Sequence, residues 1–426
     1  MVTELMGWDW LFSLMQYGPV WKQHRNLFFK HFPVNTTAFH PVQIKESHIL
    51  LRSLFLKPKD FLSDTRRSAA AIILQITYGI QIDEKVDEDG DNYVSLADKA
   101  MFSFGRAGLF GSFMVVRIAM LSALNFEIYI LLSLKGLPAN TETYAPLDAG
   151  GLIQKIGPSK MRNGVASPCI VASELEDIIS GRAPQENERI LKNVAATSYA
   201  GGADTTVSVL VSLYLVMTLY PEIQNKAQRQ LDQVLEGRLP VFEDRPQLPF
   251  IDCICYELLR WNPVTPLGLN HYAMNDDENY LDPKCLGNTP RSVSHFSCVF
   301  AESLSSERYD HHRDVYPDPF TFSPERFENV EKNIAQGINE IPGAVFGFGR
   351  RICPGRWMAF DSIWIAVASI LSVYRISKAV DENGKVIEPE VGYTSSLLSH
   401  PKPFQCSITP RSAEAAKLVL QTADQD

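Results

Sequence analysis

The sequence has little positive charge and lacks the patterns of a nucleic-acid-binding protein. Its 426 residues include 40 Lys and Arg against 49 Asp and Glu, for a formal net charge of -9. No basic stripe and no aromatic-rich RNA-binding signature is present along the chain. We therefore expect no nucleic acid among its partners.

The sequence also lacks a disulfide framework and a dinucleotide-binding unit. Its seven cysteines are odd in number and scattered through a long chain. No G-x-G-x-x-G segment follows a strand pattern, so we expect no dinucleotide site in this chain. The hydrophobic share of 45% and charged share of 21% are those of an ordinary globular protein, long enough to enclose a deep apolar pocket.

Membrane-targeting signals are weak in the sequence. Residues 1–16 contain neither a basic n-region nor a long apolar run, which predicts no signal peptide or anchor there. The most apolar stretch, 113–134, is close to the length of a membrane span, but Arg117 and Glu127 interrupt it. Because charges are costly in hydrocarbon, a buried or irregular segment is favoured over a span.

Helical patterns dominate what is present. Four stretches have the periodicity and boundaries of helices: residues 188–219, 222–235, 250–261 and 356–374. Pro221 follows the first of them and Pro263 the third. Strand patterns are sparse, so the sequence predicts a mainly α protein with a small β component.

One cysteine lies in a glycine-rich loop before the last of these helices. Residues 346–355 have the sequence FGFGRRICPG, which places Cys353 near the end of the loop. Gly349 and Gly355 permit close approach of the backbone to a flat cofactor, and backbone N–H groups can hydrogen-bond the sulfur. Arg351 can bind a propionate through two parallel hydrogen bonds. We interpret this segment as a haem-thiolate loop with Cys353 as the axial ligand of iron.

The pattern F-x-x-G-x-R-x-C-x-G, which begins at Phe346, resembles the signature of the cytochrome P450 family at every fixed position. In that family a cysteine thiolate donates electron density that favours cleavage of the O–O bond. The resemblance implies haem b as cofactor and dioxygen as co-substrate. It also implies the haem-thiolate monooxygenase fold, in one domain over residues 1–426.

A second motif, AGGADTT at residues 200–206, lies inside the long predicted helix. Its two glycines weaken a helix by about 1 kcal/mol each relative to alanine, while their small size lets a planar cofactor lie against the helix. A threonine hydroxyl there can bond a backbone carbonyl and open a local kink. The motif resembles the family's oxygen-activation motif, which makes Asp204 and Thr205 the acid–alcohol pair that delivers protons to bound dioxygen.

Further residues match the family pattern in other parts of the chain. Glu257 and Arg260, three apart on one predicted helix face, would form with Arg326 a buried structural triad that supports the cysteine loop.

Trp21 and Arg25 match the family's W-x-x-x-R helix, where a spacing of four places both on one face toward a propionate. His271 stands at the place of another propionate contact, with an ordinary loop histidine as the alternative.

Two stretches depart from the family pattern. Residues 113–159 lack the amphipathic helices expected over the substrate pocket, and residues 284–310 lack a strand pair. The chain also begins just before the Trp21 helix, which predicts a fold incomplete at its N-terminus and without the family's membrane anchor. Family members lie at the cytoplasmic face of the endoplasmic reticulum membrane, and the missing anchor leaves that location open for this chain.

The resemblance therefore implies a monooxygenase of the fungal microsomal type, active in secondary metabolism, that inserts one oxygen atom into an apolar small molecule. Electrons from NADPH would come through a separate NADPH–cytochrome P450 reductase. Substrate contacts are expected at residues 196–205, 264–269 and 394–398. Two alternatives stay open. The first is a haem-binding pseudoenzyme, which is compatible with the two stretches that depart from the family pattern. The second is a thiolate-haem isomerase or dehydratase, which the Asp204–Thr205 pair disfavours because such an enzyme does not need to protonate dioxygen.

Overall fold

The computed structural model describes residues 9–34, 37–82, 168–266, 268, 316–329, 343–347, 349–394 and 397–424. The predictions for residues 113–159 and 284–310, and for His271, lie outside the described residues.

Within the described residues the protein is mainly helical, as predicted, with one small sheet. The α-helices are α2 Pro19–His31, α3 His40–Leu56, α4 Phe61–Tyr78, α9 Ile170–Ile179, α10 Asn187–Leu219, α11 Pro221–Leu235, α12 Pro249–Trp261, α16 Arg356–Val373 and α17 Ala413–Gln421. Short 3-10 helices are η1 Phe12–Leu14, η2 Pro58–Asp60, η4 Phe242–Gln247, η6 Pro324–Phe327, η7 Gly343–Phe346, η8 Gly349–Arg351 and η9 Thr422–Asp424. The strands are β1 Tyr374–Lys378 and β2 Cys406–Pro410.

The helix boundaries follow local sequence chemistry. Helices α2, α11 and α12 each begin with a proline, whose fixed φ suits the first helical position and whose missing N–H has no partner to lose there. Helix α4 ends at Gly79, whose φ of 67° is the left-handed conformation that glycine adopts without strain. Helix α17 begins after Ser412, whose hydroxyl accepts a hydrogen bond from the N–H of Ala415. The four predicted helices therefore lie within one residue of their expected boundaries.

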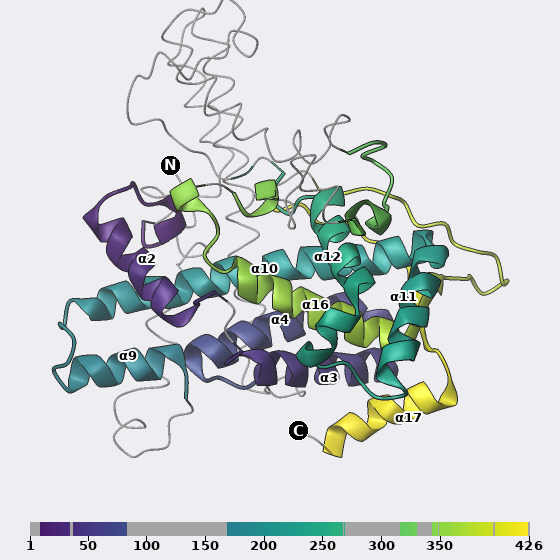
Figure 1. Ribbon diagram of the computed structural model, residues 1–426, viewed down its shortest axis with the longest axis horizontal. Coiled ribbons are helices and arrows are strands. Elements are labelled where there is room, and N and C mark those ends of the chain that lie inside the picture. The colour runs from purple at the N-terminus through teal and green to yellow at the C-terminus, as the bar shows by residue number, and fades with distance from the viewer. Residues whose placement is uncertain are drawn as a thin grey trace, which may run out of the picture.

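Helix α10 is the central element of the fold. It runs across the molecule and packs against α4, α16, α2 and α9, as Figure 1 shows. Helices α10 and α16 are long and apolar enough to cross a membrane, but 72% of the most apolar window of each is buried inside the protein. Both are therefore core helices of the described structure, in agreement with their position in Figure 1.

The sheet joins the end of α16 to the C-terminal part of the chain. Strands β1 and β2 pair antiparallel, with Tyr374 opposite Pro410 and Lys378 opposite Cys406. Tyr374 is fully buried and its hydroxyl donates to the carbonyl of Leu51 in α3. This pairing places residues 397–405, which precede β2, next to the central helix.

Candidate functional site

The loop before α16 places the Cys353 sulfur beside groups that favour its charged form. The N–H of Cys353 donates to the carbonyl of Phe346 at 2.7 Å, which closes the loop. Gly347 and Gly349 have φ values of 75° and 56°, so glycine is required at both turns. Burial raises the pKa of the Cys353 thiol, while the N–H of Gly355 hydrogen-bonds the sulfur and the nearby guanidinium charges oppose the effect of burial. The loop therefore presents a free, partly buried cysteine whose thiol pKa is raised by burial and whose sulfur lies near a backbone N–H and guanidinium groups that can interact with a thiolate.

Helix α2 brings Trp21 and Arg25 to this loop. Both side chains are buried, and the Arg25 guanidinium lies 5.7 Å from the centre of the Trp21 ring. Arg25 Nη2 donates to the carbonyl of Ile352 at 2.5 Å, directly before the cysteine. Arg351 lies over the same Trp21 ring at 4.4 Å and donates to the carbonyl of Met15 at 2.8 Å. The structure thus brings together Trp21, Arg25 and Arg351, three of the side chains that the sequence pattern assigned to propionates.

This cluster fits a group that carries carboxylates. Arg25 Nε is buried and has no hydrogen-bond partner in the part of the chain that the structure describes. Burial lowers the pKa of Arg25, the Cys353 thiolate charge opposes this change, and the charges of Arg356 and Arg351 lower the pKa further. No carboxylate among the described residues forms an ion pair with Arg25 or Arg351. Because buried guanidinium groups require anionic partners, the propionates of a haem suit these arginines.

The two glycines of α10 face different surroundings. A Cβ added at Gly201 would meet no heavy atom of the described residues within 4 Å, whereas at Gly202 it would lie 2.5 Å from Ile73 Cδ1. Gly201 therefore provides the open helix surface that a planar group requires, and Gly202 permits close packing of α4. Thr205 Oγ1 donates to the carbonyl of Gly201 at 2.6 Å, the backbone contact that the sequence predicted. Helix α10 nevertheless runs unbroken through this motif.

Asp204 lies between two basic side chains that sequence reasoning missed. Arg66 Nη1 of α4 donates to Asp204 Oδ1 at 3.4 Å, and His400 Nε2 lies 3.2 Å from Asp204 Oδ2. Burial alone would raise the pKa of Asp204, but the hydrogen bond and charge of His400, with the charge of Arg66, outweigh it and lower the pKa. The nearest sequence signal was the predicted substrate segment at 394–398, which ends two residues before His400.

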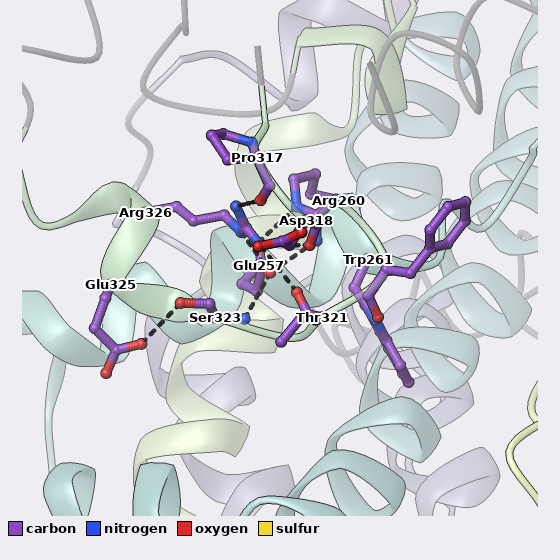
Figure 2. Close-up of polar contacts among 10 residues, drawn as sticks. Glu257, Arg260, Trp261, Pro317, Asp318, Thr321, Ser323, Glu325 and Arg326 are labelled. Atoms are coloured by element: carbon purple, nitrogen blue, oxygen red, sulfur yellow. Dashed lines mark hydrogen bonds and ion pairs between the residues drawn. The ribbon is translucent and has the colours of Figure 1, made fainter. Parts of the chain in front are cut away.

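The predicted structural triad is assembled in the described structure (Figure 2). Arg260 donates to both carboxylate oxygens of Glu257, at 2.7 and 2.8 Å, and neither side chain is exposed to solvent. Arg326 Nε donates to Glu257 Oε1 at 3.4 Å, and the N–H of Ser323 donates to the same oxygen at 2.8 Å. Burial raises the pKa of Glu257, while Arg260 and the N–H of Ser323 oppose this change.

Arg326 connects this pair to the preceding loop. Its guanidinium donates to the carbonyls of Pro317, Asp318 and Thr321, the last two at 2.7 and 3.2 Å, as Figure 2 shows. The Arg260 guanidinium also lies 5.2 Å from the centre of the buried Tyr316 ring. The triad therefore fixes residues 316–327 against α12 through charged hydrogen bonds.

Ser399, one residue beyond the predicted substrate segment 394–398, contacts α10 at Ser208 and the first residue of the predicted segment 264–269. Its carbonyl accepts from Ser208 Oγ of α10 at 2.5 Å, and its N–H donates to the carbonyl of Val264 at 2.8 Å. Asn262 Nδ2, at the end of α12, donates to Ser399 Oγ at 3.1 Å. Val264 and Leu398 are buried. These contacts fix the C-terminal segment beside α10 and the end of α12.

Comparison with known proteins gives a consistent result. The family model for cytochrome P450 matches residues 172–279 and 303–408. A cytochrome P450 monooxygenase of Armillaria gallica is 37% identical over 99% of this chain and 79% of its own length. The monooxygenase ple1 of Rhodocybe pseudopiperita is 34% identical over 98% of this chain and 76% of its own length. A solved zebrafish cytochrome P450 with abiraterone has the same fold, with a TM-score of 0.70, 19% identity and coverage of 96% of this chain and 87% of that one.

Proposed function

Because the chain belongs to the cytochrome P450 family of haem-dependent monooxygenases, we propose that it inserts one atom of dioxygen into an apolar small-molecule substrate. The observation that supports this proposal best is the arrangement around Cys353. A free cysteine in a glycine-lined loop lies beside the buried Arg25 and the partly buried Arg351, neither of which has a carboxylate partner among the described residues. These are the requirements of a thiolate-ligated haem b with two propionates.

Each residue of the cluster has a proposed role in holding the haem. Cys353 supplies the thiolate, and the N–H of Gly355 moderates its charge. Arg25 and Arg351 bind propionates, and Trp21 packs against both guanidinium groups. By the family pattern alone, we add His271 as a further propionate contact and Phe346 and Gly349 as packing positions of the loop. The bound haem supplies the redox chemistry of dioxygen, which no side chain of the protein can supply.

The α10 residues control where protons arrive. Gly201 leaves one face of the helix open. Thr205 lies one helical turn further along, and its hydroxyl donates a hydrogen bond to the carbonyl of Gly201. Asp204 is held as a carboxylate by Arg66 and His400. We assign Asp204 and Thr205 to proton delivery toward bound dioxygen, a step that positioned groups typically accelerate by about 10² to 10⁴.

The remaining assignments concern support, partners and location. We assign Glu257, Arg260 and Arg326 to support of the haem domain, which we take to comprise residues 1–426. Electrons would come from NADPH through a separate NADPH–cytochrome P450 reductase. We propose that the protein acts at the cytoplasmic face of the endoplasmic reticulum membrane, which is where family members and their reductase act.

Turnover in labelled dioxygen tests this proposal. The haem-loaded protein would be combined with the reductase and with apolar compounds selected because they shift the haem spectrum on binding. We expect one ¹⁸O atom in the product and NADPH consumption that depends on substrate. Haem binding without product would favour a pseudoenzyme, and product formed without NADPH would favour an isomerase or dehydratase.

A further inference from the structure

The two carboxylate oxygens of Asp204 contact two different basic side chains. Arg66 occupies Oδ1 and His400 occupies Oδ2, at 3.4 and 3.2 Å. Within the described residues these are the charged groups that face Asp204, one from α4 and one from the C-terminal segment. Arginine does not release its proton in proteins, whereas histidine exchanges a proton near neutral pH. The two contacts are therefore chemically distinct.

Asp204 and His400 are both largely, and similarly, shielded from solvent. The Asp204 side chain is only 12% exposed, and that of His400 is 18% exposed. Because Asp204 is held in its charged form by its neighbours, it stores no proton near neutral pH. Of the two cations that contact Asp204, the imidazole of His400 is the one whose chemistry allows it to pass a proton on, because arginine does not release its proton.

The backbone around His400 is fixed in place. The N–H of His400 donates to Thr394 Oγ1 at 3.0 Å, and the carbonyl of His400 accepts from the N–H of Thr394 at 2.8 Å. The preceding residue, Ser399, is bound to Ser208 of α10 and to Val264. His400 is thus held at a set distance from α10, so its contact with Asp204 is part of the fold.

We propose that His400 is the proton carrier that connects Asp204 to solvent during dioxygen activation. Neutral His400, protonated at Nε2, takes up a proton from solvent at Nδ1 and releases its Nε2 proton to Asp204 Oδ2. Asp204 returns to its carboxylate form when that proton moves on, and exchange of the Nδ1 proton through solvent restores the starting tautomer of His400. Arg66 keeps Oδ1 occupied, so that Oδ2 faces His400. This inference rests on the proposed monooxygenase function. His400 acts through Asp204 and is a positioning residue, not a catalytic one.

The test compares His400→Gln with a matched variant, His40→Gln. Glutamine keeps a hydrogen-bond donor for Asp204 but cannot exchange a proton. His40 also faces an aspartate, at 3.7 Å, and is similarly exposed, but it lies between α3 and α16. We expect product per NADPH to fall about tenfold or more in His400→Gln, with hydrogen peroxide formed instead and a larger solvent isotope effect. The pH profile of product per NADPH should also differ from that of the wild type, because a proton-exchanging group has been removed. The same yield and pH profile in His400→Gln as in the wild type would overturn the proposal, as would an equal loss in His40→Gln.

A measurement without turnover tests the contact itself. With ¹³C-labelled aspartate, the carboxyl resonance of Asp204 can be assigned by its loss in Asp204→Asn and titrated in the carbon-monoxide-bound protein. His400→Gln should raise the pKa of Asp204, because the imidazole charge and its hydrogen bond help to lower it. An unchanged titration would refute the proposed contact. If the wild type forms no oxygenated product, the proposed function fails and the relay with it, even where the titration shift is observed.

Discussion

The buried pair of Glu257 and Arg260 gives the sharpest prediction about stability. Both side chains have no solvent exposure, and two hydrogen bonds of 2.7 and 2.8 Å connect them. Among the described residues, Arg260→Met would leave the buried Glu257 carboxylate with the longer contact from Arg326 and the N–H of Ser323. The loss of one partner of such a pair typically costs about 3–5 kcal/mol, because the other charge stays buried. Total stabilities of about 5–15 kcal/mol make this a severe change.

A double-mutant cycle measures the interaction directly. Glu257→Leu, Arg260→Met and the double variant would be compared by equilibrium urea unfolding followed by circular dichroism. We expect each single change to cost about 3–5 kcal/mol and the double change to cost about 2–3 kcal/mol less than their sum. Arg260→Lys should cost less than Arg260→Met, since lysine keeps the charge but loses the paired geometry.

An exposed ion pair serves as the control for this cycle. Lys378 and Glu388 are joined at 2.6 Å, with 38% and 69% of their side chains exposed. Lys378→Met should change stability by only about 0–1 kcal/mol. Equal costs for Lys378→Met and Arg260→Met, or additive effects of the two triad changes, would refute the account of a buried, coupled pair.

Three further predictions concern α10 and the dependence of stability on pH. Gly201→Ala should stabilise the haem-free protein by up to about 1 kcal/mol, because alanine favours the helix, but it should reduce haem retention. Gly202→Ala should destabilise the protein by about 1–3 kcal/mol, because the added methyl group clashes with α4. Thermal melts measure the changes in stability, and haem absorbance measures haem retention. Thr205→Ala should keep haem and NADPH consumption but divert electrons to hydrogen peroxide, and unchanged coupling would contradict its role. The Arg238 guanidinium lowers the pKa of Asp244, so the charged carboxylate stabilises the fold above about pH 4 and this contribution is lost as pH falls through the lower folded value. Asp244→Asn should therefore lower Tm at pH 7 more than at pH 3, and equal shifts would contradict this.

Local signals predicted much of the fold. Proline at Pro221 and Pro263 marked helix ends, and apolar periodicity located α10, α11, α12 and α16. The last helix was expected to reach Tyr374, which instead begins β1, because its side chain is buried against α3 and its backbone pairs with β2. The loop around Cys353 was predicted because its residues are adjacent in sequence.

Contacts between distant segments were beyond the reach of local patterns. His400 is 196 residues from Asp204 and Arg66 is 138 residues from it, so neither pair leaves a signal in local spacing. The difference between Gly201 and Gly202 depends on the packing of α4, which a single helix pattern does not encode. Such pairs become visible only when the tertiary fold brings the elements together.

The spectrum of the reduced, carbon-monoxide-bound protein tests the central claim most directly. If Cys353 is the thiolate ligand of haem iron, the wild type should give the red-shifted absorbance of a thiolate-ligated carbonyl complex, and Cys353→Ala should lose it. Cys406→Ala, at a partly buried cysteine in β2, should leave the spectrum unchanged. A red-shifted spectrum that persists in Cys353→Ala would contradict the assignment.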